Sequence, residues 1–241
     1  MDHADYIAAV EREVELTAVA LGAGPLDAPV PTCPAWTVAD LAEHLGEFAG
    51  WWAAVLCEAT GREKPPFTPA SEAGADLGDW FRGIGGALVT ELRTTQADTP
   101  AYTWIPDDQS AGFIARRCAN ELAVHRVDAE SARGQPQPID AALAADGIEE
   151  IFVMVPAWGN PPDGSGKTLH LHGTDRGDEW TIAMTPDGLD VRREHADADL
   201  TLSGAVSDLH LVLFGRPPLG TVERDGDEAV LAAWDREFHF G

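Results

Sequence analysis

The sequence has very little lysine. Two of its 241 residues are lysine against fourteen arginines, and 41 acidic residues bring the net charge to −25. Proteins that bind a nucleic-acid backbone or an anionic membrane surface need clustered positive charge. The composition therefore argues against nucleic acids and membranes as partners.

Cysteines and long apolar runs are also scarce. The three cysteines, Cys33, Cys57 and Cys118, are odd in number and show no CxxC spacing. This pattern argues against a disulfide framework and against a thiolate zinc knuckle. The apolar stretch over 148–158 is too short to cross a bilayer, and the first residues are charged where a signal peptide is apolar. We expect a cytoplasmic protein.

The N-terminal part of the chain has helical patterns. Apolar residues recur at steps of three and four over 4–21, which is the period of a helix with one buried face. Thr37 followed by Asp40 forms a short capping box, which predicts a second helix to about residue 59. Further helices are predicted over 76–94, despite its glycines, and over 110–132. Four such helices make a bundle.

Beyond residue 138 the periodicity changes. One more helix is predicted to about residue 154, and helices are also expected over 204–214 and 227–234. Between them, short alternating segments separated by turn residues predict strands over 168–172, 180–184, 189–193 and 199–202. We therefore expect a two-domain α+β protein, with a helical bundle over 1–155 and a smaller α+β domain over 156–241.

Three residues of the predicted bundle have the chemistry of metal ligands. Glu121 and His125 are four residues apart and so share one face of their helix. His44 lies between Leu41 and Leu45, which indicates that it also points inward. Carboxylates and histidines on neighbouring helices can build a metal site in a bundle. On spacing alone, an exposed hydrogen bond or a satisfied core histidine would explain the same pattern.

Two segments of this region, VPTCPAWTVADLAEHLGEFAGWW (30–52) and RRCANELAVHRVDAE (116–130), resemble the mycothiol-dependent maleylpyruvate isomerase family. They share a CPxWT loop leading into a helix with an inward histidine, and an ExxxH pair on a later helix that starts after paired arginines. The segment DLTLSGAVSDLHLVLFGRPPL (199–219) resembles the second domain of that family. The resemblance implies a DinB-like four-helix bundle followed by a C-terminal α+β domain.

The resemblance also implies a divalent metal ion, with zinc favoured, bound by His44, Glu121 and His125. Three nitrogen and oxygen ligands leave one position open, as in catalytic zinc sites. A metal there would lower the pKa of a bound thiol or polarise a carbonyl group. In the reaction that the resemblance implies, the thiol of mycothiol adds to a cis double bond, the bond rotates, and elimination gives the trans isomer.

We therefore expect a metal-dependent isomerase or S-transferase that uses mycothiol as thiol cosubstrate and acts on a small electrophile, either as a monomer or as a homodimer. Two alternatives remain open. One is a metal-dependent hydrolase that holds hydroxide at the open position. The other is a non-catalytic module that sequesters a small molecule.

Several further residues have two readings each. Arg216 could bind a substrate carboxylate in a catalytic role, or it could face water. Asp128 could accept a ring N–H from His125, or it could pair with a neighbouring arginine. His170 and His172 share one face of a predicted strand, which is compatible with a metal site or with a solvated surface.

Overall fold

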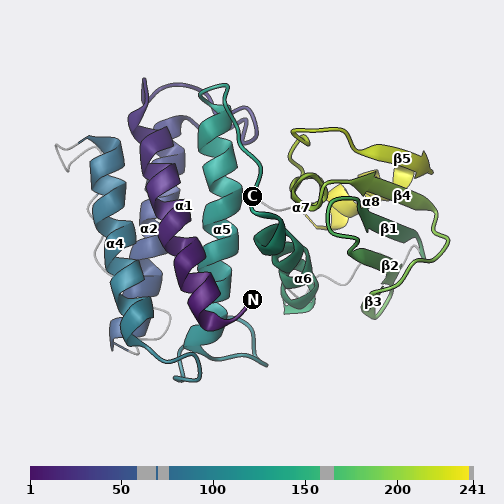
Figure 1. Cartoon of the computed structure of the whole chain (residues 1–241), viewed down its shortest axis with the longest axis horizontal. Coiled ribbons are helices and arrows are strands. Elements are labelled where there is room, and N and C mark those ends of the chain that lie inside the picture. The colour runs from purple at the N-terminus through teal and green to yellow at the C-terminus, as the bar shows by residue number, and fades with distance from the viewer. Residues whose placement is uncertain (59–68, 70–75, 158–165, 239–241) are drawn as a thin grey trace. The chain divides into compact units, whose positions relative to one another are not determined.

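The computed structural model describes residues 1–58, 69, 76–157 and 166–238. The chain forms two compact units, Met1–Gln137 and Pro138–Gly241 (Figure 1). Within the described residues, no helix combines the length and the apolar character needed to cross a membrane.

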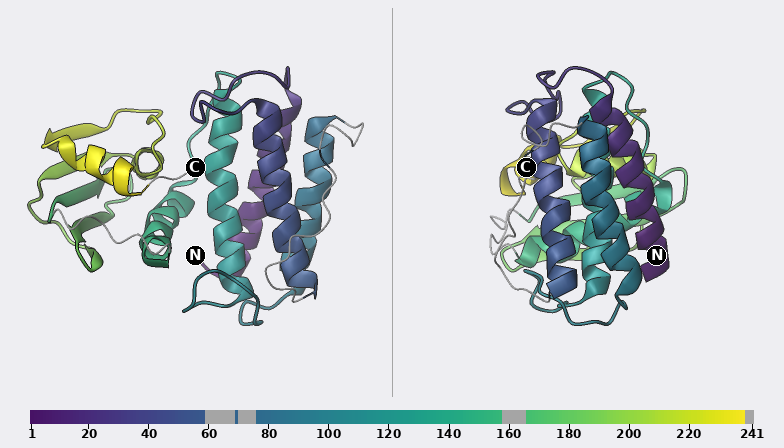
Figure 2. Two further views of the ribbon diagram at one scale, coloured as in Figure 1. Left: turned by 180° about the vertical axis from the view of Figure 1, so that it is seen from behind. Right: turned by 90° about the vertical axis from the view of Figure 1, so that its left-hand side faces the viewer.

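Among the residues that the structure describes, the first unit is a bundle of four long helices, as predicted. The helices run side by side (Figure 2) and are α1 (His3–Gly22), α2 (Val38–Glu58), α4 (Leu77–Thr94) and α5 (Ala111–Ser131). Helix α1 packs against α4 and α5, and α2 packs against the same two helices. Each helix ends within two residues of its predicted bounds, because the apolar period and the capping residues fix where a helix can begin and end.

Helix α5 differs from its neighbours because it buries charged residues as well as apolar ones. Arg117, His125, Arg126 and Asp128 are all at most 6% exposed. Arg126 is paired with Glu13 of α1 at 2.9 Å and with Glu130 at 2.7 Å, so its charge is compensated. Because buried charges are costly unless they are paired, Arg117, His125 and Asp128 also need partners.

In its described part, the second unit is a five-stranded sheet with helices. Its elements are α6 (Ala141–Ala157), β1 (Thr168–Gly173), β2 (Glu179–Thr185), β3 (Gly188–Arg192), β4 (Leu200–Gly204), α7 (Val206–Leu213), β5 (Glu223–Gly226) and α8 (Ala229–Glu237). The strand order is β3-β2-β1-β4-β5, with β1 and β4 parallel and the other pairs antiparallel.

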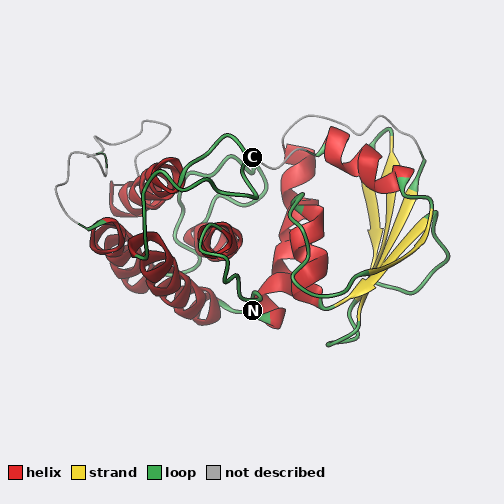
Figure 3. Cartoon of the chain, turned by 90° about the horizontal axis from the view of Figure 1, so that it is seen from above, coloured by secondary structure: helices red, strands yellow, loops and turns green. Residues whose placement is uncertain are grey.

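The sheet has one apolar face, which the helices of its unit cover. Leu169, Leu171, Ile182 and Leu202 are fully buried and alternate with more polar residues along their strands. Figure 3 shows helices packed along one face of the strands and none of the described helices of this unit along the other. Side chains that alternate with the apolar ones therefore lie on the open face.

Two features of this unit differ from the sequence-based expectation. Strand β5 was not predicted, and helix α6 belongs with the sheet, since it contacts α7 and β3. The compact units consequently divide between Gln137 and Pro138, before α6, whereas the sequence placed the division after residue 155.

Candidate metal centre

His44, Glu121 and His125 come together in the bundle. The Nε2 atom of His44 lies 3.3 Å from Oε1 of Glu121, and Nε2 of His125 lies 3.4 Å from the same oxygen. The two imidazole ring centroids are 4.8 Å apart. One ligand atom from each residue therefore lies within 4.8 Å of the other two.

Local structure explains this convergence. Glu121 and His125 are one turn apart on α5, so their side chains lie one above the other. On α2, Leu41 and Leu45 are fully buried, which sets the face of the helix that packs inward and places His44 at the edge of that face.

The start of α2 is fixed by the predicted capping box. The backbone N–H of Thr37 donates to Oδ2 of Asp40 at 2.8 Å, and the Thr37 hydroxyl donates to the same atom at 2.6 Å. These hydrogen bonds, that from the hydroxyl first, hold the pKa of the Asp40 carboxyl below its usual value. The cap thus anchors the helix one turn before His44.

The geometry fits a divalent ion. Two ligands that each lie about 2.0–2.1 Å from a tetrahedral ion are about 3.3–3.4 Å apart, which is the separation of each histidine nitrogen from Glu121 Oε1. The side chains of His44, Glu121 and His125 are 36%, 14% and 8% exposed. The set therefore reaches from the interior toward solvent, so that a further ligand could approach from outside.

Asp128 orients one of the histidines. Its Oδ2 lies 2.8 Å from Nδ1 of His125, and the carboxylate is fully buried. When Nδ1–H donates to this carboxylate, Nε2 keeps its lone pair for a metal ion. Cys33 adds a contact from the CPxWT loop, with its Sγ 3.6 Å from the same carboxylate oxygen. Of the two readings of Asp128, the structure favours the histidine partner.

Two side chains that the sequence analysis did not assign to the site also contact the ligands. Arg117 forms an ion pair with Oε2 of Glu121, one turn earlier on α5. The ring centroid of Trp36 lies 5.0 Å from that of His44 and 6.0 Å from that of His125. The spacing of four residues could have indicated Arg117, whereas Trp36 was marked only by its place in the CPxWT loop.

Arg216 lies in the other unit, shortly after α7. It is 5% exposed, and its Nη1 donates to the carbonyl oxygen of Phe214 at 2.7 Å. The side chain is therefore held close to its own backbone, and the alternative of a water-facing arginine does not apply. A role in substrate binding stays a prediction.

Comparison with known proteins agrees with the two units. Residues 7–130 match the family model of the mycothiol maleylpyruvate isomerase N-terminal domain, and residues 142–233 match the MDMPI C-terminal domain model. A search of curated protein sequences finds no significant match.

Two solved structures have the same fold. They are a mycothiol-dependent maleylpyruvate isomerase, with 15% identity and a TM-score of 0.61, and a point mutant of such an enzyme, with 14% identity and a TM-score of 0.63. Each match covers 93% of this chain and 93% of the solved one. At this identity the likeness concerns the fold.

Proposed function

Because the chain belongs to the mycothiol maleylpyruvate isomerase family, we propose that it is a metal-dependent enzyme that uses mycothiol to isomerise a small electrophile or to transfer a thiol to it. The observation that carries the proposal is the close approach of His44 Nε2 and His125 Nε2 to Oε1 of Glu121, with one ligand atom of each residue within 4.8 Å of the others. Membership of the family indicates mycothiol as the thiol, and the three candidate ligands would hold an ion that activates it.

His44, Glu121 and His125 would hold the ion, and zinc is favoured because imidazole and carboxylate ligands suit it. A divalent ion bound there supplies positive charge that lowers the pKa of an adjacent thiol and polarises a carbonyl oxygen. Three protein ligands leave room for one such group.

The surrounding residues keep the ligands in place before any substrate binds. Asp128 holds the tautomer of His125, and Arg117 binds the second oxygen of Glu121, which leaves Oε1 directed at the histidines. Ligands fixed in this way need no rearrangement during the reaction.

Trp36 is suited to contact the thiol cosubstrate. Its ring is half-buried and lies beside both ligand histidines. An aromatic face next to the reactive position would pack against the sugar portion of mycothiol while the thiol reaches the metal centre. The electrophile would then be attacked at the same end of the bundle.

The proposal can be tested by metal analysis and a thiol titration. We expect about one divalent ion per purified chain at this centre, with His125→Ala abolishing it and Glu121→Gln weakening binding more than it weakens the fold. His3→Ala, which removes a histidine of α1 outside the centre, serves as the matched control. After substitution with cobalt, saturating mycothiol should produce an intense sulfur-to-metal band in the near ultraviolet.

Each contrary result has a distinct meaning. Full metal retention in His125→Ala would overturn the ligand assignment. A loaded protein without the sulfur band would overturn thiol activation and favour the hydrolase. Tight thiol binding without turnover of any electrophile would favour the sequestering module.

A further inference from the structure

Three histidines surround a single carboxylate in the second unit. His170 Nε2 lies 3.0 Å and His195 Nδ1 lies 2.9 Å from Oε2 of Glu179. The other carboxylate oxygen, Oε1, is 3.0 Å from Nδ1 of His172. None of these residues belongs to the centre in the helical bundle.

Sheet register brings the cluster together. His172 on β1 pairs directly with Glu179 on β2, and His170 pairs with Thr181, two residues further along. Opposite and diagonal positions on one face of an antiparallel pair are close enough for side chains to touch. Leu169 and Leu171 point to the other, helix-covered face, so the histidines lie on the open one.

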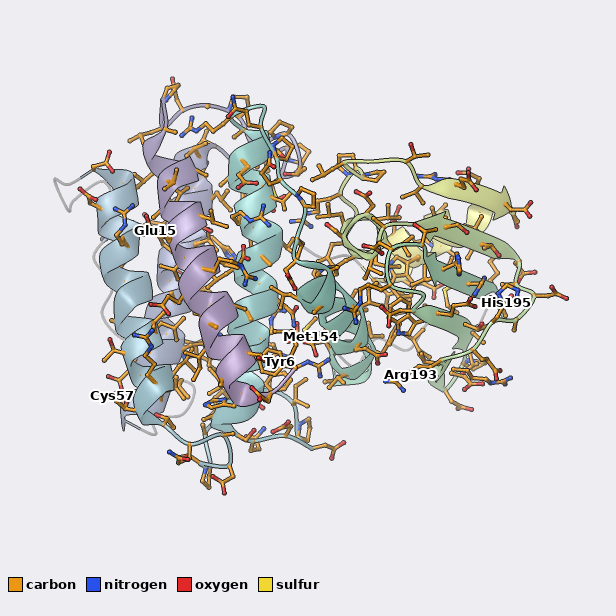
Figure 4. The ribbon with its side chains drawn as sticks, in the orientation of Figure 1. Tyr6, Glu15, Cys57, Met154, Arg193 and His195 are labelled. Atoms are coloured by element: carbon orange, nitrogen blue, oxygen red, sulfur yellow. The ribbon has the colours of Figure 1, made fainter. Side chains whose placement is uncertain are left out.

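His195 joins from the segment that follows β3. The Thr181 hydroxyl donates to the carbonyl oxygen of Glu194 at 2.9 Å, which keeps this segment alongside β2. The preceding arginine, Arg193, is bound elsewhere, since its Nε donates to Oε1 of Glu149 at 2.6 Å. In Figure 4, Arg193 is labelled near α6, whereas His195 is labelled at the outer edge of the unit, away from α6.

We propose that His170, His195 and Glu179 form a second binding site for a divalent transition-metal cation, with His172 holding the remaining carboxylate oxygen. Imidazole and carboxylate ligands together suit Zn²⁺, Ni²⁺ and Cu²⁺, with Cu²⁺ bound most tightly. Such an ion would join β1, β2 and the segment after β3.

The geometry supports an ion shared by these residues. The ligand atoms of His170, Glu179 and His195 lie within 4.8 Å of one another. Two ligands at right angles about an ion, each about 2.0–2.2 Å away, are about 2.8–3.1 Å apart, so the present separations need to change little.

Burial of the cluster is graded in a way that suits metal entry. The side chain of His170 is 1% exposed, that of Glu179 is 22% exposed, and that of His195 is 73% exposed. The ligands on the strands are held by the sheet, and the exposed histidine leaves a path from solvent. The buried His170 and the exposed His195 each place a ring nitrogen beside Oε2 of Glu179.

The test uses the full-length chain with the helical centre disabled by His125→Ala. After treatment with a chelator, the protein is titrated with Zn²⁺ or Cu²⁺ near pH 7.5 by calorimetry. We expect one remaining site, and at least about tenfold weaker binding when His195→Ala or Glu179→Gln is added. His3→Ala in the same background should leave the affinity unchanged.

Two further readouts identify the ligands and the location. The paramagnetic resonance spectrum of the Cu²⁺ form should show coupling to two nitrogens and lose one of them in His195→Ala. Zn²⁺ should raise the melting temperature of the His125→Ala protein, and not that of the variant that also carries Glu179→Gln.

The inference is overturned if the His125→Ala protein binds no ion, or if neither His195→Ala nor Glu179→Gln changes its affinity. Failure of this inference is distinguishable from failure of the proposed function. The second site is tested by metal binding to the His125→Ala protein, whereas the helical centre is tested by the metal that is lost when His125→Ala is introduced.

Discussion

At the residue scale, Asp128 is the group whose effect on the proposed metal centre is easiest to isolate. It is fully buried and bound to Nδ1 of His125. Asp128→Asn keeps the shape but replaces the anionic acceptor by a neutral amide. We expect the affinity for Zn²⁺ to fall about 10–100-fold, the typical effect of losing a partner of a ligand histidine. Competition with a chromophoric chelator measures the change.

The control for this substitution is Asp98→Asn, which removes the same charge at an exposed position in the same unit. It should bind Zn²⁺ as the unmodified chain does. Equal affinities for Asp128→Asn and the unmodified protein would mean that Asp128 serves packing and its contact with Cys33 alone.

The same residues show how far sequence reasoning reaches. Spacing and family resemblance were enough to name His44, Glu121 and His125, which the fold brings together. They left the partner of Asp128 undecided, because both His125 and Arg126 lie within three residues of it in the sequence. Only the packing of α1 on α5 shows that Arg126 is already taken by Glu13.

At the element scale, the glycines of α4 separate helix propensity from packing. A Cβ atom on Gly85 would lie 2.6 Å from Cγ1 of Val14, whereas one on Gly83 would meet nothing within 4 Å. We expect Gly83→Ala to stabilise the fold by about 0.5–1 kcal/mol through helix propensity. Gly85→Ala should destabilise it by about 1–3 kcal/mol, because it forces α1 and α4 apart.

Urea unfolding of both variants measures the difference, and exposed Gly86, with nothing within 4 Å, provides a second control. If Gly85→Ala were as stable as Gly83→Ala, the close approach of α1 and α4 at this position would be wrong. The sequence alone treated all three glycines as weak points of one helix, since it does not reveal which of them faces a neighbour.

The capping box of α2 leads to a dependence on pH. The pKa of Asp40 is lowered in the folded protein by its hydrogen bonds from Thr37. A lowered folded pKa means that the stabilisation is complete above the unfolded value of about 3.9 and is lost as the pH falls through the folded value. The unmodified chain should therefore be more stable than Asp40→Asn at pH 7, and the gap should close as the pH falls below about 4.

Urea unfolding of both proteins between pH 7 and pH 3 measures this difference in stability. The control variant Asp98→Asn should show no such difference from the unmodified chain. A gap of constant size over the whole range would mean that the carboxylate form of Asp40 contributes nothing specific to the cap.

Most helices and strands could be predicted from their periods, and β5 shows where this stops. Its residues, Glu223–Gly226, are polar and all exposed, so they have neither an apolar alternation nor a buried face. The strand exists because its backbone pairs with β4, with Leu200 opposite Gly226. Pairing of this kind depends on the partner strand and leaves no mark in the local sequence.

At the scale of the whole molecule, the assignment of α6 decides where the chain divides. The predicted domain boundary after residue 155 places α6 in the bundle, because the helical period changes only beyond this helix. The structure groups it with the sheet, where the indole N–H of Trp180 donates to Glu149 at 2.7 Å and the backbone N–H of Ile139 donates to Ser207 at 2.9 Å. Periodicity identifies a helix but does not identify which core it covers.

This division predicts which fragments fold. A fragment over 138–241 should unfold cooperatively, whereas one over 156–241 should not, because it lacks most of α6. Leu143, Ile148 and Ile151 of that helix are fully buried. Burying each such side chain contributes about 1.5–3 kcal/mol, so losing all three removes an amount comparable to the whole stability of a domain, about 5–15 kcal/mol.

Thermal unfolding followed by circular dichroism, together with binding of a hydrophobic dye, compares the two fragments. The complementary fragment over 1–137 contains all three proposed ligands of the bundle and should bind one divalent ion with the affinity that the helical centre has in the full chain. Equal stability of the fragments starting at 138 and at 156 would instead place the division after residue 155 and assign α6 to the bundle.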